Sequence, residues 1–249
     1  SLNFVYDKNS PLRKKTAKKF KCETSNNFEE ILKNKEIKLF IIASPTSTHE
    51  YYLNKLVKYK KMIYCEKPIS LNGSKLNSLV KKIKTNRIKI CIGLNRRFSD
   101  AYIKMKRLIK NKKLKIVQII SRSSNANVQQ SVRNGGLFMD KGFHFFDLAC
   151  WFANSLPIKI ITIADPLSTR EFLKNNDYSD AFVNMKFKNN LTAEFVFSRS
   201  SRLGHEERIK LFGKGFKIDS DNFFKKSIIY KNFDIKHKDS YFRCLKKFV

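Results

Sequence analysis

The first 95 residues alternate short, uninterrupted hydrophobic runs with stretches of helical spacing. The runs predict strands, because the strands of a parallel sheet are buried on both faces. The stretches between them predict helices; Ser10 is the expected cap of the first, with Pro11 at its first position, and Asn27 caps the second. The predicted strands are residues 2–6, 37–43, 62–65 and 89–93, and the helices run through residues 10–20, 28–32, 52–57 and 74–83. This order predicts a Rossmann-like α/β domain with a parallel sheet over residues 1–95.

Beyond residue 97 the pattern changes. The predicted elements are a helix over about residues 99–110, a strand over 115–122, a looser segment and an aromatic-rich helix over about 138–152. From residue 158 onward mostly strands are predicted; Val183, Met185 and Phe187 alternate with polar residues, and later segments repeat this pattern. A period of two is typical of an antiparallel sheet with one solvent-exposed face. We therefore predict a second, α+β domain over residues 96–249 with a largely antiparallel open sheet.

The net charge of +31 at pH 7 raises the question of nucleic-acid binding. Lysines recur along almost the whole chain, whereas a nucleic-acid interface gathers them in one arm or on one face. Lys, Asn, Ile and Phe are all abundant and have A/T-rich codons, so a base bias of the genome accounts for the set. We expect a solvated basic surface and no specific nucleic-acid partner.

The five cysteines are widely spaced and odd in number, and none forms a CxxC pair. This usage predicts free, buried thiols in a reducing compartment, because a disulfide framework or a zinc site needs closer spacing. No hydrophobic run approaches the roughly 18 residues of a membrane span, and the opening residues lack the pattern of a signal peptide. We expect a cytoplasmic protein with no metal site and no membrane association.

Polar segments directly follow three predicted strands, at the edge where open α/β sheets bind their ligands. Asp7 follows the first strand; in a dinucleotide-binding fold an acid here binds the adenosine ribose, although many strand-ending aspartates only shape a turn. Lys8 beside it suits a 2′-phosphate, so NAD and NADP both stay open. The second segment, Ala-Ser-Pro-Thr-Ser-Thr-His over residues 43–49, is a candidate cofactor loop in which Ser47 or Thr48 also suits a helix cap.

The third segment is Cys-Glu-Lys-Pro over residues 65–68. Pro68 restricts the backbone of Lys67 and is itself a candidate for a cis peptide bond. A lysine held at the end of a strand is well placed to point into a cleft. In a chain this rich in lysine, a plain surface role is the alternative.

The most informative segment, residues 135–151, reads Gly-Gly-x3-Asp-x3-His-x2-Asp-x3-Trp. Helical spacing places Asp140, His144 and Asp147 on one stripe of an otherwise hydrophobic helix. Titratable groups on such a helix are costly to bury unless they pair or face a wet cleft. A carboxylate one turn from a histidine can orient its ring for proton transfer near neutral pH, and a His–Asp pair in the core is the structural alternative.

These segments together resemble the Gfo/Idh/MocA oxidoreductase family, and most of all its inositol 2-dehydrogenase branch. Ala-Ser-Pro-x3-His, Glu-Lys-Pro, the Gly-Leu-Asn-Arg-Arg-Phe run of residues 93–98 and the Gly-Gly segment occur in the family's order and spacing over nearly the whole chain. Four motifs in register are far more specific than one. The resemblance implies an NAD(P)-dependent oxidoreductase that moves hydride between a nicotinamide and a hydroxyl of a sugar or cyclic polyol, with myo-inositol as the best expectation.

By the same resemblance, Lys67, Asp140 and His144 form the catalytic group. The histidine takes the hydroxyl proton, the lysine stabilises the charge that develops on the reacting oxygen, and the aspartate orients the group. The implied cofactor contacts, with NAD favoured over NADP, are Asp7, Ser44, Pro45, His49, Glu66 and Lys67. The implied substrate contacts are Arg97, Asn125, Asp140, His144 and His205.

The chain also departs from the family. The family's glycine-rich phosphate loop and first strand, which is central to the sheet, precede the position of Asp7, so we expect the chain to begin inside a longer protein; family members also continue past Val249. His205 stands where the inositol branch tends to carry Tyr, and Ser99 and Phe145 replace acids, so the particular sugar stays open. A non-catalytic relative that binds or regulates is the alternative function, and nucleic-acid binding rests on charge alone.

The expected partners follow from this interpretation. We expect a small-molecule sugar or polyol and neither a specific nucleic acid nor a membrane. We also expect a homo-oligomer, a dimer or a tetramer, that forms through the antiparallel sheet.

Overall fold

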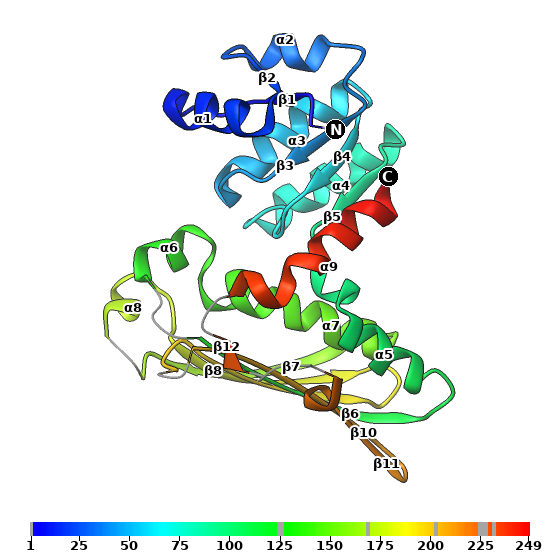
Figure 1. The fold of residues 1–249 in the computed structure, drawn as a ribbon. Coiled ribbons are helices and arrows are strands. Elements are labelled where there is room, and N and C mark those ends of the chain that lie inside the picture. The colour runs from blue at the N-terminus through cyan, green and yellow to red at the C-terminus, as the bar shows by residue number, and fades with distance from the viewer. Residues whose placement is uncertain (1, 124–126, 168–169, 202–203, 224–228, 231–232) are drawn as a thin grey trace. The chain divides into compact units, whose positions relative to one another are not determined.

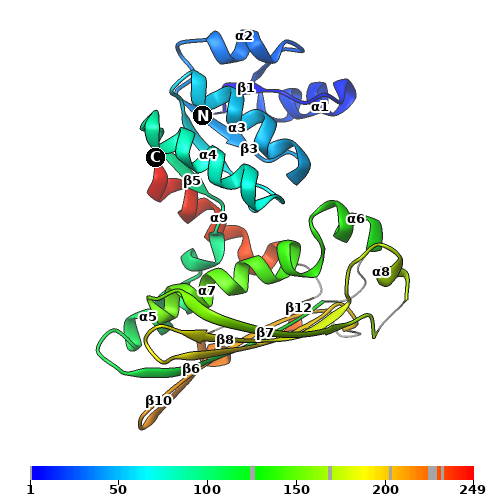
Figure 2. The ribbon, with the colours of Figure 1, turned by 180° about the vertical axis from the view of Figure 1, so that it is seen from behind.

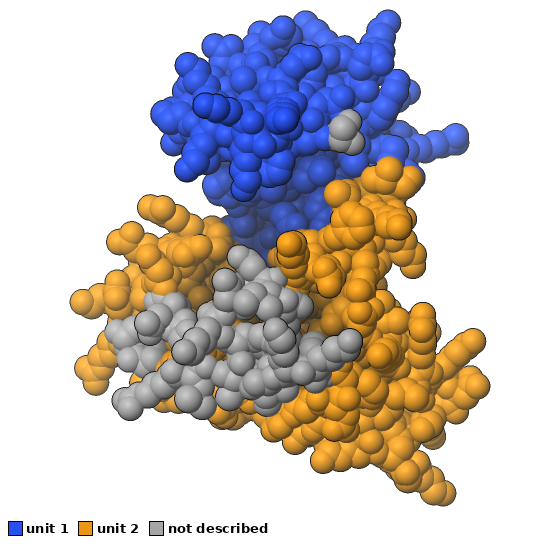
Figure 3. Space-filling model, viewed as in Figure 1, with its two compact units in different colours: residues 1–92 blue, residues 93–249 orange. Residues whose placement is uncertain are grey.

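The computed structural model describes residues 2–123, 127–167, 170–201, 204–223, 229–230 and 233–249. The chain forms two compact units, residues 1–92 and residues 93–249, which are coloured separately in Figure 3. Each unit has a hydrophobic core of its own. None of the described helices is long and hydrophobic enough to cross a membrane.

Strands and helices alternate along unit 1, as its hydrophobic runs predict (Figure 1). Every predicted strand and helix is present, with ends that differ by a few residues, and the short strand β2 is additional. The elements are β1 (Phe4–Val5), α1 (Ser10–Phe20), β2 (Glu23–Thr24), α2 (Phe28–Lys33), β3 (Leu39–Ile42), α3 (His49–Lys58), β4 (Met62–Cys65), α4 (Gly73–Thr85) and β5 (Ile90–Ile92). A 3-10 turn, Thr46–Thr48, leads into α3.

The described strands of unit 1 pair in parallel, but in two separate sheets. β1 pairs with β2, and β3, β4 and β5 form a three-stranded sheet in that order. Parallel pairing of strands that alternate with helices is the arrangement expected of a Rossmann-like domain. Tyr6, Phe28 and Tyr52 pack against one another with ring centroids 5.0 to 6.3 Å apart, which joins the end of β1 to α2 and α3.

Two of the unit 1 helices test the predicted caps. α1 begins at Ser10, but its cap is Asn9, whose Oδ1 accepts a hydrogen bond from the Leu12 amide at 2.9 Å. The prediction of Ser10 as cap is therefore wrong by one residue, because asparagine satisfies the exposed amides as well as serine does. Asn27 caps α2 as predicted, and its Oδ1 accepts hydrogen bonds from the amides of Glu29 and Glu30.

Unit 2 consists of one large sheet with α5 and α7 on one of its faces (Figures 1 and 2). Its helices are α5 (Asp100–Leu108), α6 (Val128–Arg133), α7 (Phe143–Ala153), α8 (Glu171–Lys174) and α9 (Phe233–Phe248), with 3-10 turns at Asn95–Phe98 and Ser220–Phe223 and a π-helix, Leu137–Gly142, directly before α7. Its strands are β6 (Leu114–Arg122), β7 (Pro157–Asp165), β8 (Asp180–Phe187), β9 (Thr192–Ser198), β10 (His205–Gly213), β11 (Phe216–Asp219) and β12 (Ile229–Tyr230).

The strand order of this sheet is β11-β10-β6-β9-β8-β7, with β12 beside β10. Neighbouring strands are antiparallel except β6 and β9, which are parallel. The predicted alternation is confirmed, since Val183, Met185 and Phe187 are buried and the residues between them are exposed. These side chains share one core with Met105 of α5 and Phe145 of α7. The prediction of a largely antiparallel open sheet is thus confirmed, with one parallel pair.

The hydrophobic pattern did not predict the helices α6, α8 and α9. The prediction of mostly strands after residue 158 is therefore wrong for α8 and α9. α6 and α8 have only six and four residues. Among the side chains of α9 that the structure describes, the buried ones are His237, Ser240 and Cys244, and none of these is large and hydrophobic. A helix with such a buried face lacks the hydrophobic periodicity on which the prediction depends.

Buried polar groups hold α9 in unit 2. Arg96 Nη2 donates to Glu207 Oε1 at 2.6 Å, and His237 Nε2 lies 3.0 Å from Glu207 Oε2. These three side chains are at most 6% exposed. Asn95 Nδ2 donates to Ser240 Oγ at 3.0 Å. Together the contacts join α9 to β10 and to the turn that precedes α5.

Candidate functional site

The predicted cofactor segments, residues 43–49 and 65–68, meet at the carboxyl edge of the three-stranded sheet. β3 and β4 are neighbours, and Ile42 pairs with Cys65 where they end. The Glu66 amide donates to the Ile42 carbonyl at 2.9 Å, so the pairing extends past the strands. The two segments therefore leave the sheet side by side, where loops of open α/β sheets bind their ligands.

The loop after β3 is stabilised by its own hydroxyl groups. Ser44 Oγ lies 2.6 Å from Thr48 Oγ1, and Thr48 Oγ1 donates to the Pro45 carbonyl at 2.7 Å. Thr48 stands at the cap position of α3, but its side chain makes no capping hydrogen bond. The hydroxyl of Thr48 thus shapes the loop that carries Ser44 and Pro45 instead of capping the helix.

His49, a predicted cofactor contact, is buried at 1% exposure. Its Nδ1 lies 2.8 Å from the Pro68 carbonyl oxygen, and its Nε2 lies 2.9 Å from the Ser44 carbonyl oxygen. The ring therefore spans the loop after β3 and the segment after β4.

The segment after β4 has the cis Lys67–Pro68 peptide bond for which the sequence made Pro68 a candidate. Lys67 and Glu66 are both half-buried. Burial raises the pKa of the Glu66 carboxyl, an effect that the neighbouring Lys67 opposes. The Tyr64 hydroxyl donates to Glu66 Oε1 at 3.4 Å. A carboxyl group and an amine thus follow β4 in consecutive positions.

Asp7 lies two residues beyond the end of β1. Its Oδ1 accepts from the Asn9 amide at 2.8 Å, and its carbonyl accepts from Arg13 Nη1 at 2.7 Å. Asp7 therefore shapes the turn into α1, which was the structural alternative, and this role engages one of its two carboxylate oxygens.

In unit 2 the Gly135–Gly136 turn sets the start of the π-helix. Both glycines have positive φ, 91° and 76°. A Cβ on Gly136 would lie 2.5 Å from Oδ1 of the buried Asp177. Asp177 accepts from the Leu137 amide at 2.8 Å and from Ser131 Oγ at 2.6 Å. The second glycine of the motif is thus needed for close approach of this carboxylate, which no sequence motif revealed.

Asp140 lies in the π-helix, and His144 follows it in the first turn of α7. Asn134 Nδ2 lies 3.5 Å from Asp140 Oδ1, and Arg199 Nη2 lies 3.4 Å from Asp140 Oδ2. The side chain of Arg199 is 7% exposed, and His144 is 6% exposed. The structure thus brings two of the three predicted catalytic residues onto one helical segment, with a buried guanidinium beside the carboxylate.

Asp147, the third polar residue of the predicted stripe, pairs with Arg97. Arg97 Nε donates to Asp147 Oδ2 at 2.7 Å, and Nη2 donates to Oδ1, which makes the pair bidentate. Burial raises the pKa of the Asp147 carboxyl, whereas the Arg97 guanidinium opposes that rise. Arg97, a predicted substrate contact, is therefore held by α7.

Lys141, between Asp140 and His144 in the sequence, was not singled out by any motif. Its Nζ donates to Ser123 Oγ at 2.9 Å and to the Ser198 carbonyl at 3.0 Å, which ties the π-helix to the ends of β6 and β9. Burial lowers the pKa of its ammonium group to about 7. The signal that could have revealed it is a lysine on a helix whose other members are mostly hydrophobic.

The remaining predicted site residues are spread over both units. Asn125 lies outside the described residues. His205 begins β10 and is half-buried. Lys67 belongs to unit 1, whereas Asp140 and His144 belong to unit 2.

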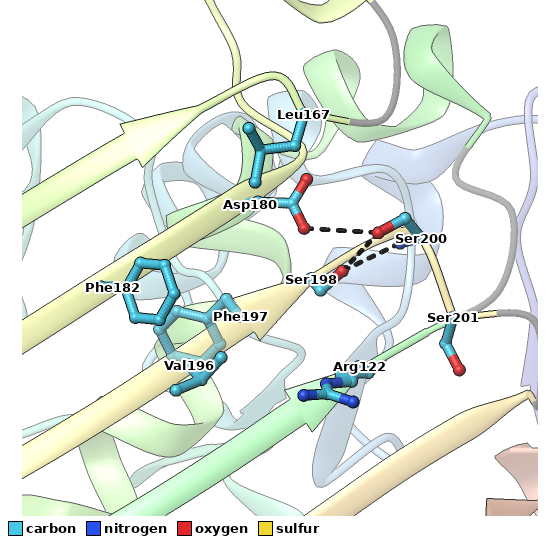
Figure 4. A pocket seen from close by; sticks show the side chains of 9 residues that line it. All are labelled: Arg122, Leu167, Asp180, Phe182, Val196, Phe197, Ser198, Ser200 and Ser201. Atoms are coloured by element: carbon cyan, nitrogen blue, oxygen red, sulfur yellow. Dashed lines mark hydrogen bonds between the residues drawn. The ribbon is translucent and has the colours of Figure 1, made fainter.

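A hollow of about 430 Å³ lies at the ends of β6, β8 and β9 (Figure 4). Arg122, Phe182 and Val196 line it together with Ser198 and the serines that follow β9. Figure 4 shows the hydrogen bonds that the Ser200 hydroxyl makes with its neighbours in this wall. None of the predicted site residues that the structure describes lines this hollow.

The described residues contain no group of three or more His, Cys, Asp or Glu side chains that could hold a metal ion. All five cysteines are free thiols, as predicted, although only Cys65 and Cys244 are buried. Burial raises the pKa of the Cys65 thiol to about 12, so it is an inert core residue.

Comparison with known proteins identifies both units. Residues 1–94 match the family described as "Oxidoreductase family, NAD-binding Rossmann fold". Residues 102–218 match the GFO/IDH/MocA C-terminal domain.

Two curated relatives and one solved structure illustrate the similarity. The chain is 26% identical over 236 residues to myo-inositol 2-dehydrogenase of Thermotoga maritima, covering 88% of this chain and 71% of that protein. It is 27% identical over 191 residues to inositol 2-dehydrogenase of Rhizobium meliloti, covering 75% and 58%. The chain thus spans only part of its relatives. Scyllo-inositol dehydrogenase of Lactobacillus casei, solved with NAD(H) and scyllo-inositol, shares the fold with a TM-score of 0.89 at 19% identity, covering 100% of this chain and 80% of that one.

Proposed function

Because the chain belongs to the GFO/IDH/MocA oxidoreductase family, we propose that the whole protein is an NAD-dependent dehydrogenase of cyclic polyols. The observation that carries this proposal is the placement of Asp140 and His144 on one helical segment whose other side chains are mostly hydrophobic. Titratable groups are costly to bury in such a segment unless they pair or have a function. Asp140 is paired with Arg199, and the His144 imidazole is the natural base for a hydroxyl proton.

The residues at the carboxyl edges of the unit 1 strands fit NAD. The Asp7 carboxylate follows β1, and hydroxyl-bearing and acidic segments follow β3 and β4. A carboxylate after the first of these strands suits the two ribose hydroxyls of NAD and would repel the 2′-phosphate of NADP. We therefore favour NAD, with Ser44, Pro45 and Glu66 lining it. The structure of the Lactobacillus casei relative with NAD(H) supports this choice.

The chemistry that we propose needs one base, one donor and one orienting group. A bound nicotinamide would supply the hydride acceptor for the carbon that bears the reacting hydroxyl. His144 removes the proton of that hydroxyl, and the Lys67 ammonium hydrogen-bonds the same oxygen while its negative charge develops. Asp140, itself held by Arg199, keeps the group in its working orientation.

We propose myo-inositol as the substrate, because the relatives from Thermotoga maritima and Rhizobium meliloti are inositol dehydrogenases. Arg97, Asn125 and His205 are the proposed contacts to the other hydroxyls of the ring. The bidentate pair with Asp147 would present the Arg97 guanidinium in one fixed orientation.

The test is a substrate panel with the full-length protein. Myo-inositol, scyllo-inositol and several sugars are each incubated with NAD⁺ and with NADP⁺, and reduced cofactor is measured by its absorbance. We expect turnover with at least one inositol and preference for NAD⁺. Binding of NAD⁺ without turnover of any polyol would instead favour the non-catalytic relative, and absence of NAD⁺ binding would contradict the proposal altogether.

We also propose that the protein forms a homo-oligomer through the face of the unit 2 sheet that lies opposite α5 and α7. Ile163 of β7 and Phe182 of β8 are paired neighbours on that face. They are 70% and 54% exposed. Large hydrophobic side chains that lie together on a sheet surface are typical of an interaction site.

A further inference from the structure

His49 connects the two loops that leave the carboxyl edge of the three-stranded sheet in unit 1. One ring nitrogen faces the Ser44 carbonyl oxygen after β3, and the other faces the Pro68 carbonyl oxygen after β4. Pro68 directly follows Lys67. Both nitrogens therefore face the backbone of the chain, and the residue is only 1% exposed.

We propose that His49 is a positioning residue of the cofactor site, which fixes the loop carrying Ser44 and Pro45 relative to the segment carrying Lys67. This inference rests on the proposed function, in which the loop lines the cofactor and Lys67 contacts the reacting oxygen. It replaces the expected direct contact between His49 and the cofactor with an indirect role.

The physical basis is the need of buried carbonyl groups for donors. A buried backbone carbonyl without a hydrogen bond costs free energy, so loops that lose their donor open until water can reach them. One rigid ring, that of His49, faces a carbonyl oxygen in each loop. Movement of either loop alone would break one of the two contacts, so the ring couples their positions.

The two carbonyl partners also specify the protonation state in which the His49 ring makes both hydrogen bonds. Carbonyl oxygens only accept hydrogen bonds, so the ring can donate to both only when both nitrogens carry a proton. A neutral ring retains one of the two bonds. The charged groups beside this site are Glu66 and Lys67 from the segment after β4 and Glu50 from α3. Burial raises the pKa of the Glu66 carboxyl, and its coulombic interaction with His49 acts against that rise.

The experiment compares the full-length protein with its His49→Phe and His49→Gln variants. Hydrogen–deuterium exchange of residues 44–48 and 66–70 is measured without cofactor, and the Kd for NAD⁺ is measured by titration. For His49→Phe we expect faster exchange in both segments together and about tenfold weaker NAD⁺ binding, since the ring that faces the Ser44 and Pro68 carbonyls loses its donors. We also expect kcat at saturating NAD⁺ to fall, because Lys67 is no longer held. His49→Gln keeps a donor amide, so we expect its exchange rates and its Kd for NAD⁺ to lie between those of the wild type and of His49→Phe.

Leu56→Ala is the matched control, because Leu56 is a buried residue of the same helix and its side chain belongs to the hydrophobic core. Equal effects of Leu56→Ala on both loops and on NAD⁺ binding would reduce His49 to a general contribution to stability and overturn the inference. Unchanged exchange and Kd in His49→Phe would overturn it too; if that variant does not fold, His49→Gln provides the same comparison. If the wild type does not bind NAD⁺, the proposed function fails, whereas the exchange measurement still decides whether His49 couples the loops.

Discussion

The imidazole of His144 is the base that the proposed reaction requires. Replacing it in His144→Ala should lower kcat by roughly 10²–10⁴-fold, the usual contribution of a positioned general base. The free energy of unfolding, measured with urea, should change little. Initial rates at saturating NAD⁺ and polyol give the comparison.

Cys150→Ala, in the same helix α7, is the control for this variant. The Cys150 side chain is half-buried and its thiol pKa is raised by burial, so it has no part in the proposed proton transfer. We expect kcat to be unchanged in this control. A His144→Ala enzyme with the wild-type rate would remove His144 from the mechanism.

Lys141 should make the stability of the protein depend on pH. Burial lowers the pKa of its ammonium group to about 7 in the folded state, whereas an unfolded lysine has a pKa of about 10.4. Between these values the unfolded state binds a proton that the folded state has lost, so this residue makes stability rise with pH. Lys141→Met should therefore be most stabilising, relative to wild type, at pH 7 and below, and its advantage should shrink toward pH 10.

Urea unfolding of wild type and Lys141→Met at pH 6, 8 and 10 measures this difference. Lys188→Met, at an exposed position of unit 2, is the control and should show no such trend. A difference between Lys141→Met and wild type that stays constant over this range would show that the amine remains charged throughout.

Single residues also show how much of the candidate site could be predicted from the sequence alone. Asp140 and His144 are visible in the sequence because a titratable pair is unusual in a hydrophobic helix. Arg199 and Asp177 are not visible, because each lies far from the motif and only the folded sheet brings it to the π-helix. In a chain with 52 lysines and arginines, charge type alone does not distinguish a buried guanidinium from a solvated one.

At the scale of elements, the Gly135–Gly136 turn determines where the segment with Asp140 begins. Gly136 has a φ of 76° and no room for a Cβ beside Asp177. We expect Gly136→Ala to lower the free energy of unfolding by about 1–3 kcal/mol, from backbone strain and from displacement of that carboxylate. It should also lower kcat, because the π-helix would shift.

Gly73→Ala is a control with the same chemical change. Gly73 lies in α4, and beyond its chain neighbours and the backbone of its own helix no atom lies within 4 Å of the position that its Cβ would take. This substitution should leave kcat unchanged and raise stability by about 0.5 kcal/mol, because alanine restricts the unfolded chain. If both substitutions have the same effect, the turn has no special role.

Elements were predictable where their packing is simple. β4 of unit 1 is a run of mostly buried residues, and β8 of unit 2 alternates buried and exposed residues, so both patterns appear directly in the sequence. α9 packs through His237 and Ser240, which pair with other polar residues, and its periodicity becomes apparent only with those partners. The π-helix was likewise predicted only as part of one long helix, because hydrophobic spacing does not distinguish the two over a single turn.

At the scale of the whole molecule, the exposed sheet face predicts an oligomer. Charged residues introduced on that face should dissociate it. Phe182→Glu together with Ile163→Glu would place two carboxylates in the proposed interface, where burying them is costly. We expect analytical ultracentrifugation to show oligomers for the wild type and monomers for the double variant. Leu108→Glu, at an exposed position of α5 on the other side of the sheet, should leave the oligomer intact. A wild type that is monomeric at micromolar concentration would contradict the proposal.

The strand β7 lies at one end of the unit 2 sheet and contains four isoleucines, three of which are at least 55% exposed. An edge strand of this composition can add a strand from another molecule and begin aggregation. Like-charge repulsion from the net charge of +31 acts against such encounters. Salt shortens the range of that repulsion to about 3 Å at 1 M. Concentrated solutions of this protein should therefore stay clear in dilute buffer and become turbid when salt is added.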